Sequence, residues 1–357
     1  MPTPVSIDIS PWYEHPTTPN RDGLAVSASR APTYTPIQVS DFEDGTVDTG
    51  AGGSDAFPGG SYGSQYRGSP LPVFEGSQSG EWVGDCGHNG NTGFTNGGRY
   101  DFSPVLGKGD KVWIKFKAFL PIGYNYTGDP FLKFLRIRTN ASGGGANEGY
   151  NDIYFEQIDT ANGFYYIKEQ DDVPKYSLNG HHPVLGVWET YEYHVAFDNV
   201  PAASAGTGRA RLWKNDELII DVDDVPTLNT ATSEAAWIYF GSFWNGGAPL
   251  LLTSISGPII VGNAITASPS GAGGTLASKI VNSLGQNYFI DSDATPSPAF
   301  EDGDTITDSI TSETATLAKA NQLMYIDDLI IATETPNLVD QSGNPFISSR
   351  HTAVNFD

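Results

Sequence analysis

The chain has 357 residues, and its 42 acidic and 19 basic residues give a formal net charge of −23, which argues against nucleic acid as a partner because a phosphate backbone would be repelled. Only 17% of the residues are charged, whereas Gly (41), Pro (24), Tyr (17) and Phe (18) are frequent. This composition predicts an all-β fold of short strands and turns, in one large or two modest domains.

No run of about 18 apolar residues is present, so no membrane span is expected. The N-terminus has neither the basic start nor the apolar stretch of a signal peptide. We therefore expect another route out of the cell, such as release of a virus particle by lysis, or a leader that was removed. The single cysteine, Cys86, allows no intrachain disulfide and no thiolate metal site.

Residues 1–80 are rich in Pro, Gly, Ser and Thr and predict an extended arm. One segment, 37–47, is a candidate first strand of the following domain. Trp12 and Tyr13 are aromatic anchors that suit attachment to other subunits. We therefore expect the arm to be an assembly element.

Residues 81–249 contain strand patterns at close spacing, and MYIDDLII (324–331) adds a last one. The clearest patterns are KVWIKFKAFL (111–120), FLKFLRIRT (131–139), DIYFEQI (152–158), GFYYIKEQ (163–170), ETYEYHVAF (189–197) and GRARLWKN (208–215). Asn215-Asp216 predicts a two-residue hairpin turn, and a short helical turn is expected over 232–236. The spacing predicts an antiparallel sandwich over 81–249 plus 322–334, with a C-terminal tail over 335–357.

Residues 250–321 interrupt this sandwich and contain a repeat. GNAITASPSGAGGTLAS (262–278) and GDTITDSITSETATLAK (303–319) align without gaps and share seven of seventeen residues. Each unit reads as strand, polar turn, strand, which predicts a small inserted β-module. A spacer or assembly contact without chemistry is the alternative role for this module.

Basic and aromatic residues recur on alternate strand positions. In 131–139, Arg136 and Arg138 are expected on one face with Phe134, and His194 shares the polar face of its strand with Glu192. We expect one concave surface to collect the basic residues, with two further residues at its rim, and to bind a glycan. The predicted set is Arg136, Arg138, Lys168, His194 and Arg211, with Trp244 and Asn245 at the rim.

Several segments occur in an order that resembles a known family. They are PFLKFLRIRTN (130–140), NEGYNDIYF (147–155), WETYEYHVAF (188–197), RLWKNDELI (211–219), YFGSFWNGGAP (239–249) and MYIDDLIIA (324–332). They resemble concanavalin A-like jelly-roll proteins of the polysaccharide-lyase type, including glucuronan- and alginate-lyase-like sequences. The resemblance implies a jelly-roll sandwich, a fold that also serves lectins, carbohydrate-binding modules and virion proteins. The insert resembles β-rich modules of bacteriophage structural proteins.

A polysaccharide lyase neutralises the uronate carboxylate, removes the neighbouring proton and protonates the leaving oxygen. If the chain is a lyase, Arg138, His194 and Tyr166 are the candidates for these roles. The strand patterns familiar from alginate lyases, basic-Glu-Leu-Arg and Gln-Ile-His, are absent. Glu156-Gln157-Ile158 matches the second pattern in part, without its histidine. The carboxylate spacing of a retaining glycosidase is absent as well.

No cofactor is required by these hypotheses, but a structural calcium ion is considered. Glu43 and Asp44 would meet Asp328 if the first and last strands pair, and hard oxygen ligands suit calcium. The alternative is that these acids form a turn and face solvent.

Three functions therefore stay open. The first is a glycan-binding jelly-roll protein that is a structural or surface component of a phage-like virion. The second is a polysaccharide lyase that cleaves an anionic, uronate-containing glycan, and the third is an assembly protein that binds no sugar. The expected partners are a polysaccharide or cell-surface glycan and other virion or self subunits, and the expected location is the virion or the extracellular space.

Overall fold

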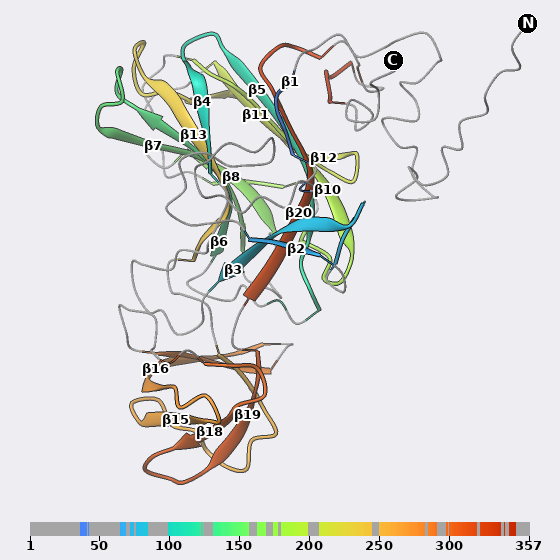
Figure 1. Cartoon of the computed structure of the whole chain (residues 1–357). Coiled ribbons are helices and arrows are strands. Elements are labelled where there is room, and N and C mark those ends of the chain that lie inside the picture. The colour runs from blue at the N-terminus through green and yellow to red at the C-terminus, as the bar shows by residue number, and fades with distance from the viewer. Residues whose placement is uncertain are drawn as a thin grey trace, which may run out of the picture.

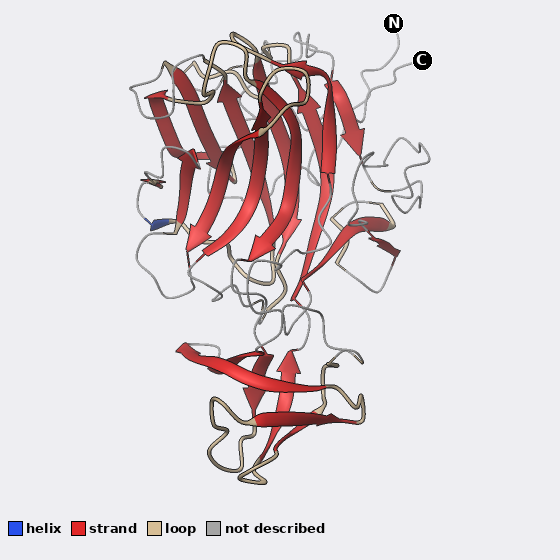
Figure 2. Cartoon of the chain, turned by 90° about the vertical axis from the view of Figure 1, so that its left-hand side faces the viewer, coloured by secondary structure: helices blue, strands red, loops and turns tan. Residues whose placement is uncertain are grey.

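The computed structural model is almost entirely β-sheet and contains two antiparallel sheets and a closed barrel (Figures 1 and 2). The predicted all-β jelly-roll sandwich is confirmed. The structure describes residues 36–40, 42, 65–68, 72–74, 76–84, 99–122, 124, 131–156, 163–168, 174–177, 180–198, 207–244, 250–282, 285–290, 298, 300–319, 322–336, 339 and 343–347.

The first sheet has eight strands in the order β12-β11-β10-β5-β20-β3-β2, with β1 also paired to β20. Its strands are β1 (Pro36–Ser40), β2 (Gln65–Gly68), β3 (Gln78–Gly84), β5 (Lys111–Phe119), β10 (Trp188–Ala196), β11 (Gly208–Lys214), β12 (Glu217–Val225) and β20 (Gln322–Ala332). Strand β1 overlaps the candidate first strand at 37–47, and β2 lies in the segment expected to be an extended arm. Strands β1 and β20, which are far apart in sequence, therefore lie side by side in this sheet.

The second sheet has six strands in the order β4-β13-β6-β7-β8-β9, and Figure 2 looks onto it. Its strands are β4 (Arg99–Leu106), β6 (Phe131–Asn140), β7 (Asn147–Glu156), β8 (Phe164–Lys168), β9 (Lys175–Tyr176) and β13 (Glu234–Trp244). The two sheets pack face to face, and the side chains between them form the core.

Aromatic rings fill the centre of this core. Phe116 of β5 lies 5.7 Å from Phe134 of β6 and 5.3 Å from Phe240 of β13, measured between ring centroids. Phe134 in turn lies 5.1 Å from Tyr191 of β10. Each large side chain buried in this way stabilises the fold by about 1.5–3 kcal/mol.

A β-bulge in β6 changes which of its side chains face outward. The pairing register with β7 shifts between Lys133 and Leu135, so Phe134 and Leu135 both enter the core. The prediction that Phe134 shares a face with Arg136 is therefore wrong. Lys133 lies instead on the side of the two arginines.

Two local turn predictions have opposite outcomes. Asn215 and Asp216 have φ angles of 47° and 67°, as a two-residue hairpin turn between β11 and β12 requires, so this prediction is confirmed. The expected helical turn over 232–236 is wrong, because β13 already begins at Glu234.

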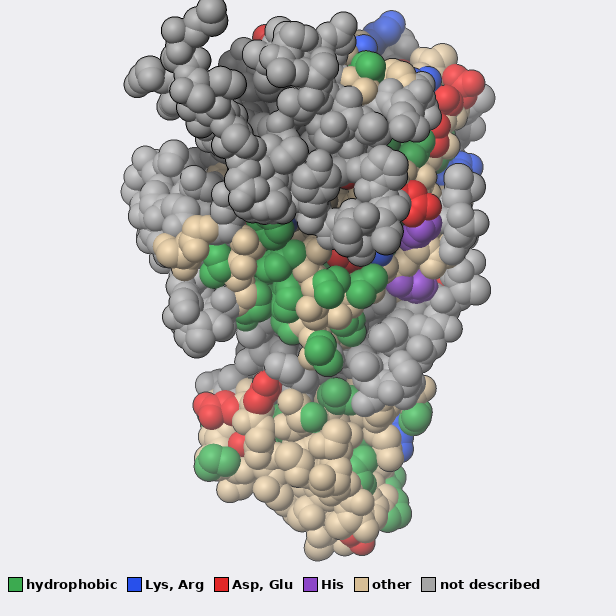
Figure 3. Space-filling model, turned by 90° about the vertical axis from the view of Figure 1, so that its right-hand side faces the viewer, with side chains coloured by type: hydrophobic (Ala, Val, Ile, Leu, Met, Phe, Trp, Pro, Cys, Tyr) green, Lys and Arg blue, Asp and Glu red, His purple; other side chains and the backbone are tan. Residues whose placement is uncertain are grey.

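Between β13 and β20 in sequence, six strands form the closed barrel β14-β17-β16-β15-β18-β19. They are β14 (Leu250–Thr253), β15 (Ala264–Ser268), β16 (Gly273–Asn282), β17 (Gly285–Ile290), β18 (Thr305–Asp308) and β19 (Thr314–Lys319). On the face seen in Figure 3, the barrel is mostly covered by neutral polar side chains and backbone.

The sequence repeat is also a structural repeat. The Gly262 N–H donates to the Leu276 carbonyl (2.8 Å), and the equivalent Gly303 N–H donates to the Leu317 carbonyl (2.7 Å). β15 and β18, which are equivalent strands, pair antiparallel with each other. The barrel thus has an internal near-two-fold arrangement; its independent folding stays a prediction.

Part of the C-terminal tail covers the outer face of the eight-stranded sheet. The Ile347 N–H donates to Glu192 Oε1 (3.1 Å), and Lys115 Nζ donates to the Ile347 carbonyl (3.0 Å). The Ile347 side chain packs with Trp113 and Ile330. One residue of the tail is therefore bound by both its backbone polar groups and its side chain.

Candidate functional site

The outer face of the six-stranded sheet carries two cross-strand rows of aromatic and charged side chains. Cross-strand pairing sets these rows, because directly opposite residues point to the same side of a sheet. The first row runs Asp101, Trp237, Arg138, Tyr150, and the second runs Arg99, Tyr239, Arg136, Asp152, on β4, β13, β6 and β7 in turn. We call these eight residues the Trp237 face.

Trp237 is the centre of this face. The guanidinium carbons of Arg99 and Arg138 lie 5.0 and 5.3 Å from its ring centroid. The rings of Tyr239 and Tyr150 lie 4.3 and 5.7 Å from it. Arginine over tryptophan is favourable by about 0.5–2 kcal/mol, and these contacts hold the side chains in fixed positions.

The arginines of the face differ in their partners. Arg136 Nε donates to Asp152 Oδ2 (3.0 Å), and its guanidinium carbon lies 3.7 Å from the Tyr150 ring centroid. Arg99 Nε donates to Asp101 Oδ1 (2.8 Å), whereas Arg138 Nε donates to the neutral amide oxygen of Asn140 (2.7 Å). The two aspartates therefore balance two arginines, and the charge of Arg138 remains.

Access to the face is uneven. Trp237 and Arg136 each retain only 7% of their surface, and Asp152 is fully buried. Arg99, Asp101, Arg138, Tyr150 and Tyr239 are half-buried. A partner would therefore meet mainly the guanidinium of Arg138 and the two tyrosines, while the buried residues hold them in place.

The aromatic surface continues beyond the two rows. Lys133 Nζ lies 5.6 Å from the ring centroid of Tyr154 on β7, and this ring lies 5.4 Å from that of Tyr165 on β8. All three side chains are buried. They support the sheet beside the accessible part of the face rather than extend that part.

Of the predicted site residues, Arg136 and Arg138 lie on the Trp237 face, but Lys168 does not. It belongs to the same sheet and points to the inner side, where Nζ donates to Thr139 Oγ1 (2.8 Å) and to the Glu148 carbonyl (3.1 Å). Tyr166 also points inward from β8, and its hydroxyl donates to Asn151 Oδ1 (2.9 Å). Both are at most 1% exposed, which argues against contact with a polysaccharide.

His194 and Arg211 lie on the outer face of the other sheet. His194 stacks on Trp113 with ring centroids 4.4 Å apart, and Arg211 Nε donates to Asp221 Oδ1 (2.7 Å). Burial first, and then Arg211 and other nearby cations, lower the pKa of His194 to about 3, so the imidazole is neutral near neutral pH. The expectation of one surface shared by all five basic residues is therefore wrong.

The three residues named for a lyase are accordingly not brought together. Arg138 is on the outer face of one sheet, Tyr166 is in the core and His194 is on the outer face of the other sheet. Alternation along a strand predicts which residues share a side, but it does not predict which sheet a strand joins.

The remaining predicted residues are only partly within the described chain. Trp244 ends β13, but its side chain lies outside the described residues, as do Asn245, Glu43 and Asp44. Asp328 is buried. The residues that the structure describes contain no group of three or more His, Cys, Asp or Glu side chains able to hold a metal ion, and calcium binding stays a prediction.

Asp328 has a cationic neighbour in Lys117 of β5. Burial lowers the pKa of Lys117 to about 8, and Asp328, with two other aspartates, opposes this shift. Lys117 Nζ donates to Thr190 Oγ1 (3.0 Å) and lies 4.1 Å from the Phe74 ring centroid. Asp328 is therefore near enough to Lys117 to favour the charged form of this lysine.

Sequence reasoning missed Trp237, Tyr150, Asp152 and Asn140. The alternation of Trp237 with Tyr239 in WIYF (237–240) was a signal for the first of them. Tyr150 and Asp152 become visible only once the β6–β7 register is known, whereas Asn140 is a local partner of Arg138, two residues along the same strand.

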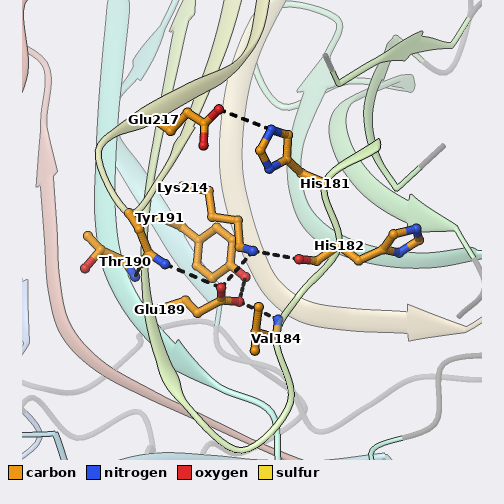
Figure 4. Close-up of polar contacts among 9 residues, drawn as sticks. His181, His182, Val184, Glu189, Thr190, Tyr191, Lys214 and Glu217 are labelled. Atoms are coloured by element: carbon orange, nitrogen blue, oxygen red, sulfur yellow. Dashed lines mark hydrogen bonds and ion pairs between the residues drawn. The ribbon is translucent and has the colours of Figure 1, made fainter. Parts of the chain in front are cut away.

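A second polar cluster, shown in Figure 4, is centred on the buried pair of Lys214 and Glu189. Lys214 Nζ lies 2.7 Å from Glu189 Oε1 and donates to the His182 carbonyl (2.6 Å). Glu189 Oε2 accepts from the Tyr191 hydroxyl and the Val184 N–H, both at 2.8 Å. The cluster fastens the segment before β10 to the sheet, and removing one partner of such a buried pair costs about 3–5 kcal/mol.

In the part of the chain that the structure describes, no helix is long and apolar enough to cross a membrane. No protein-family model matches the chain, and no curated protein sequence matches it.

Solved structures of polysaccharide lyases show a distant likeness. An endo-β-1,4-glucuronan lyase from the fungus Trichoderma reesei aligns over 84% of this chain and 91% of its own, with 11% identity and a TM-score of 0.40. The alginate lyase vAL-1 from Chlorella virus aligns over 84% and 100%, with 11% identity and a TM-score of 0.42. A mutant of the alginate lyase Aly36B, in complex with an alginate trisaccharide, aligns over 83% and 98%, with 9% identity and a TM-score of 0.43. At these TM-scores the likeness carries no inference about activity.

Proposed function

We propose that the chain binds an anionic polysaccharide on the Trp237 face. The observation that carries the proposal is the half-buried Arg138, whose guanidinium has a neutral hydrogen-bond partner and lies beside the Trp237 ring. A guanidinium matches a carboxylate in shape and can bind it through two parallel hydrogen bonds. Aromatic rings beside it offer surfaces on which the apolar faces of sugar rings can stack.

The charge distribution supports an anionic rather than a neutral ligand. The whole chain carries a net charge of −23, yet the three arginines and two aspartates of the Trp237 face leave one positive charge. A local positive site on an acidic protein attracts a carboxylate at short range, while the remaining surface repels anions that do not fit.

Equilibrium binding to alginate, with uncharged dextran as a second ligand, tests the proposal. We expect the wild-type chain to bind alginate and not dextran, and Arg138→Gln to weaken alginate binding roughly tenfold or more, since hydrogen bonds between charged groups are worth about 1.5–3 kcal/mol. Arg209→Gln is the matched control, because Arg209 lies on the other sheet and pairs with Asp223. Failure of the wild-type chain to bind alginate or any other polyuronate would refute the proposal.

A lyase is the second candidate, and it is favoured by the position of Tyr239. This half-buried tyrosine lies directly opposite Arg99 on one side and Arg136 on the other. In β-elimination, a base takes the proton from the carbon next to the uronate carboxylate, the bond to the glycosidic oxygen breaks, and that oxygen receives a proton. Because Tyr239 lies between two arginines, we assign it the acid–base role, and Arg138 would neutralise the carboxylate.

Ultraviolet absorbance of the unsaturated product distinguishes the two candidates. A lyase produces this absorbance from a polyuronate, and Tyr239→Phe should abolish it while alginate binding persists. A chain that binds alginate without releasing the product is a binding protein. A role on a virion, or in assembly with other subunits, stays a prediction.

A further inference from the structure

The arginines of the two outer faces share one feature of geometry. Each of the five whose side chains the structure describes uses Nε for a side-chain hydrogen bond. The pairs are Arg99 with Asp101, Arg136 with Asp152, Arg138 with Asn140, Arg209 with Asp223, and Arg211 with Asp221. Four partners are carboxylates, and only Arg138 among these five has an amide.

The difference between these partners is one of charge and not of shape. An asparagine oxygen accepts the same hydrogen bond as an aspartate oxygen and fixes the guanidinium in the same way. An aspartate also cancels the positive charge, whereas an asparagine leaves it. Among the described residues Arg138 has no carboxylate partner, so its charge is available to a ligand.

We propose that Asn140 is a positioning residue that makes this face selective for carboxylated sugars, an inference that rests on the proposed polysaccharide binding. Asn140 lies two residues after Arg138 on the same strand and is itself buried, with 8% of its surface exposed. It holds the guanidinium through Nε, and among the described residues no hydrogen bond from either terminal nitrogen is found, so these nitrogens are the groups that would bind the ligand.

The surroundings of Arg138 explain why this arrangement discriminates between glycans. Its guanidinium lies between β13 and β7, against Trp237 and opposite Tyr150, where water is partly excluded. A bound uronate supplies the missing negative charge in this setting of low dielectric constant. A neutral sugar covers the cation without pairing it, and an unpaired charge in a desolvated site is unfavourable.

Three substitutions separate charge from geometry. Asn140→Asp keeps the hydrogen bond and cancels the charge, so we expect roughly tenfold to a hundredfold weaker alginate binding and loss of its salt dependence. Asn140→Ala removes the hydrogen bond and keeps the charge, so binding weakens less and stays salt-dependent. Asp101→Asn is the opposite change at the neighbouring pair and should strengthen alginate binding by releasing the charge of Arg99.

The measurements are alginate affinity at several ionic strengths and thermal unfolding of each variant. If Asn140→Asp is folded and binds alginate like the wild type, or if Asn140→Ala loses as much as Asn140→Asp, the inference is overturned. If Asn140→Asp does not fold, the salt dependence of alginate binding is compared between Asn140→Ala and Arg138→Gln. Only Arg138→Gln should lose this salt dependence. Wild-type chain that binds no polyuronate refutes the proposed function itself, which is a separate outcome.

Discussion

Acid should destabilise the sandwich through His194. Burial, followed by Arg211, Arg209 and Lys111, lowers the pKa of this imidazole from 6.5 to about 3. Because the folded pKa is below the unfolded one, the unfolded chain takes up the proton first as the pH falls. The stability associated with the neutral ring is complete above pH 6.5 and is lost progressively down to about pH 3. One pKa unit corresponds to about 1.4 kcal/mol, so acidification to about pH 5 removes about 2 kcal/mol.

His194→Phe isolates this effect, since a phenyl ring keeps the stack on Trp113 and does not titrate. Urea unfolding followed by tryptophan fluorescence reports on the sandwich and not on the barrel, because residues 250–319 contain no tryptophan. The wild-type chain should lose about 2 kcal/mol more than the variant between neutral pH and about pH 5. Equal losses in the two proteins would show that His194 is protonated in the folded state and that the reasoning is wrong.

Three further predictions concern other parts of the chain. The folded pKa of Lys117, about 8, lies below its usual 10.5, so the wild type should gain stability relative to Lys117→Met as the pH rises through that window, as measured by urea midpoints. Burial alone would raise the pKa of Asp308, but hydrogen bonds from Thr311, Ile260, Asn263 and Ile310 lower it. Asp308→Ala should therefore destabilise the barrel by about 2–3 kcal/mol and speed amide exchange at Ile260 and Thr311, whose N–H groups lose their acceptor. Unchanged exchange at these two amides would contradict this prediction. Replacing 252–320 with a short Gly/Ser turn should leave a cooperatively folding sandwich, because loop length has a small effect on stability, and a non-cooperative tryptophan transition would count against it.

Much of the fold could be predicted because alternation along a strand is a local property. Val112, Ile114 and Phe116 enter the core while Lys115 and Lys117 face the other side, as the pattern of 111–120 indicates. The hairpin at Asn215-Asp216 and the repeat in 262–319 are equally local, since each depends on residues close in sequence or on self-similarity.

The assignment of strands to sheets could not be predicted in the same way. His194 and Arg138 occupy the polar side of their strands, as the sequence indicates, yet β10 and β6 belong to different sheets. Pairing between strands far apart in sequence decides this, and no periodicity within one strand contains that information. The β6 bulge, which moves Phe134 into the core, has the same origin in cross-strand register.

The hydrogen-bond partner of Arg136 also depends on the register between neighbouring strands. Asp152 meets Arg136 because β6 and β7 pair at these two positions, and a slip of one residue would point Asp152 into the core. Asn140 is a local partner of Arg138 and could be noticed in the sequence. That this neutral partner is unusual becomes clear only from the structure, in which the four other described arginines have carboxylate partners.

The outer faces of both sheets carry arginine and tryptophan side chains, and they differ in how far these side chains are exposed. The eight-stranded sheet presents Trp113, Arg211 and Trp213, which resemble the residues of the Trp237 face in type, but these retain at most 8% of their surface. The chain's own Ile347 is bound there by Glu192 and Lys115, so part of that face already has an occupant. On the six-stranded sheet, Arg138 and Tyr239 remain half-buried, and the charge of Arg138 has no carboxylate partner among the described residues. Residue types alone would allow the proposed glycan site on either face, whereas exposure and charge together favour the six-stranded sheet for it.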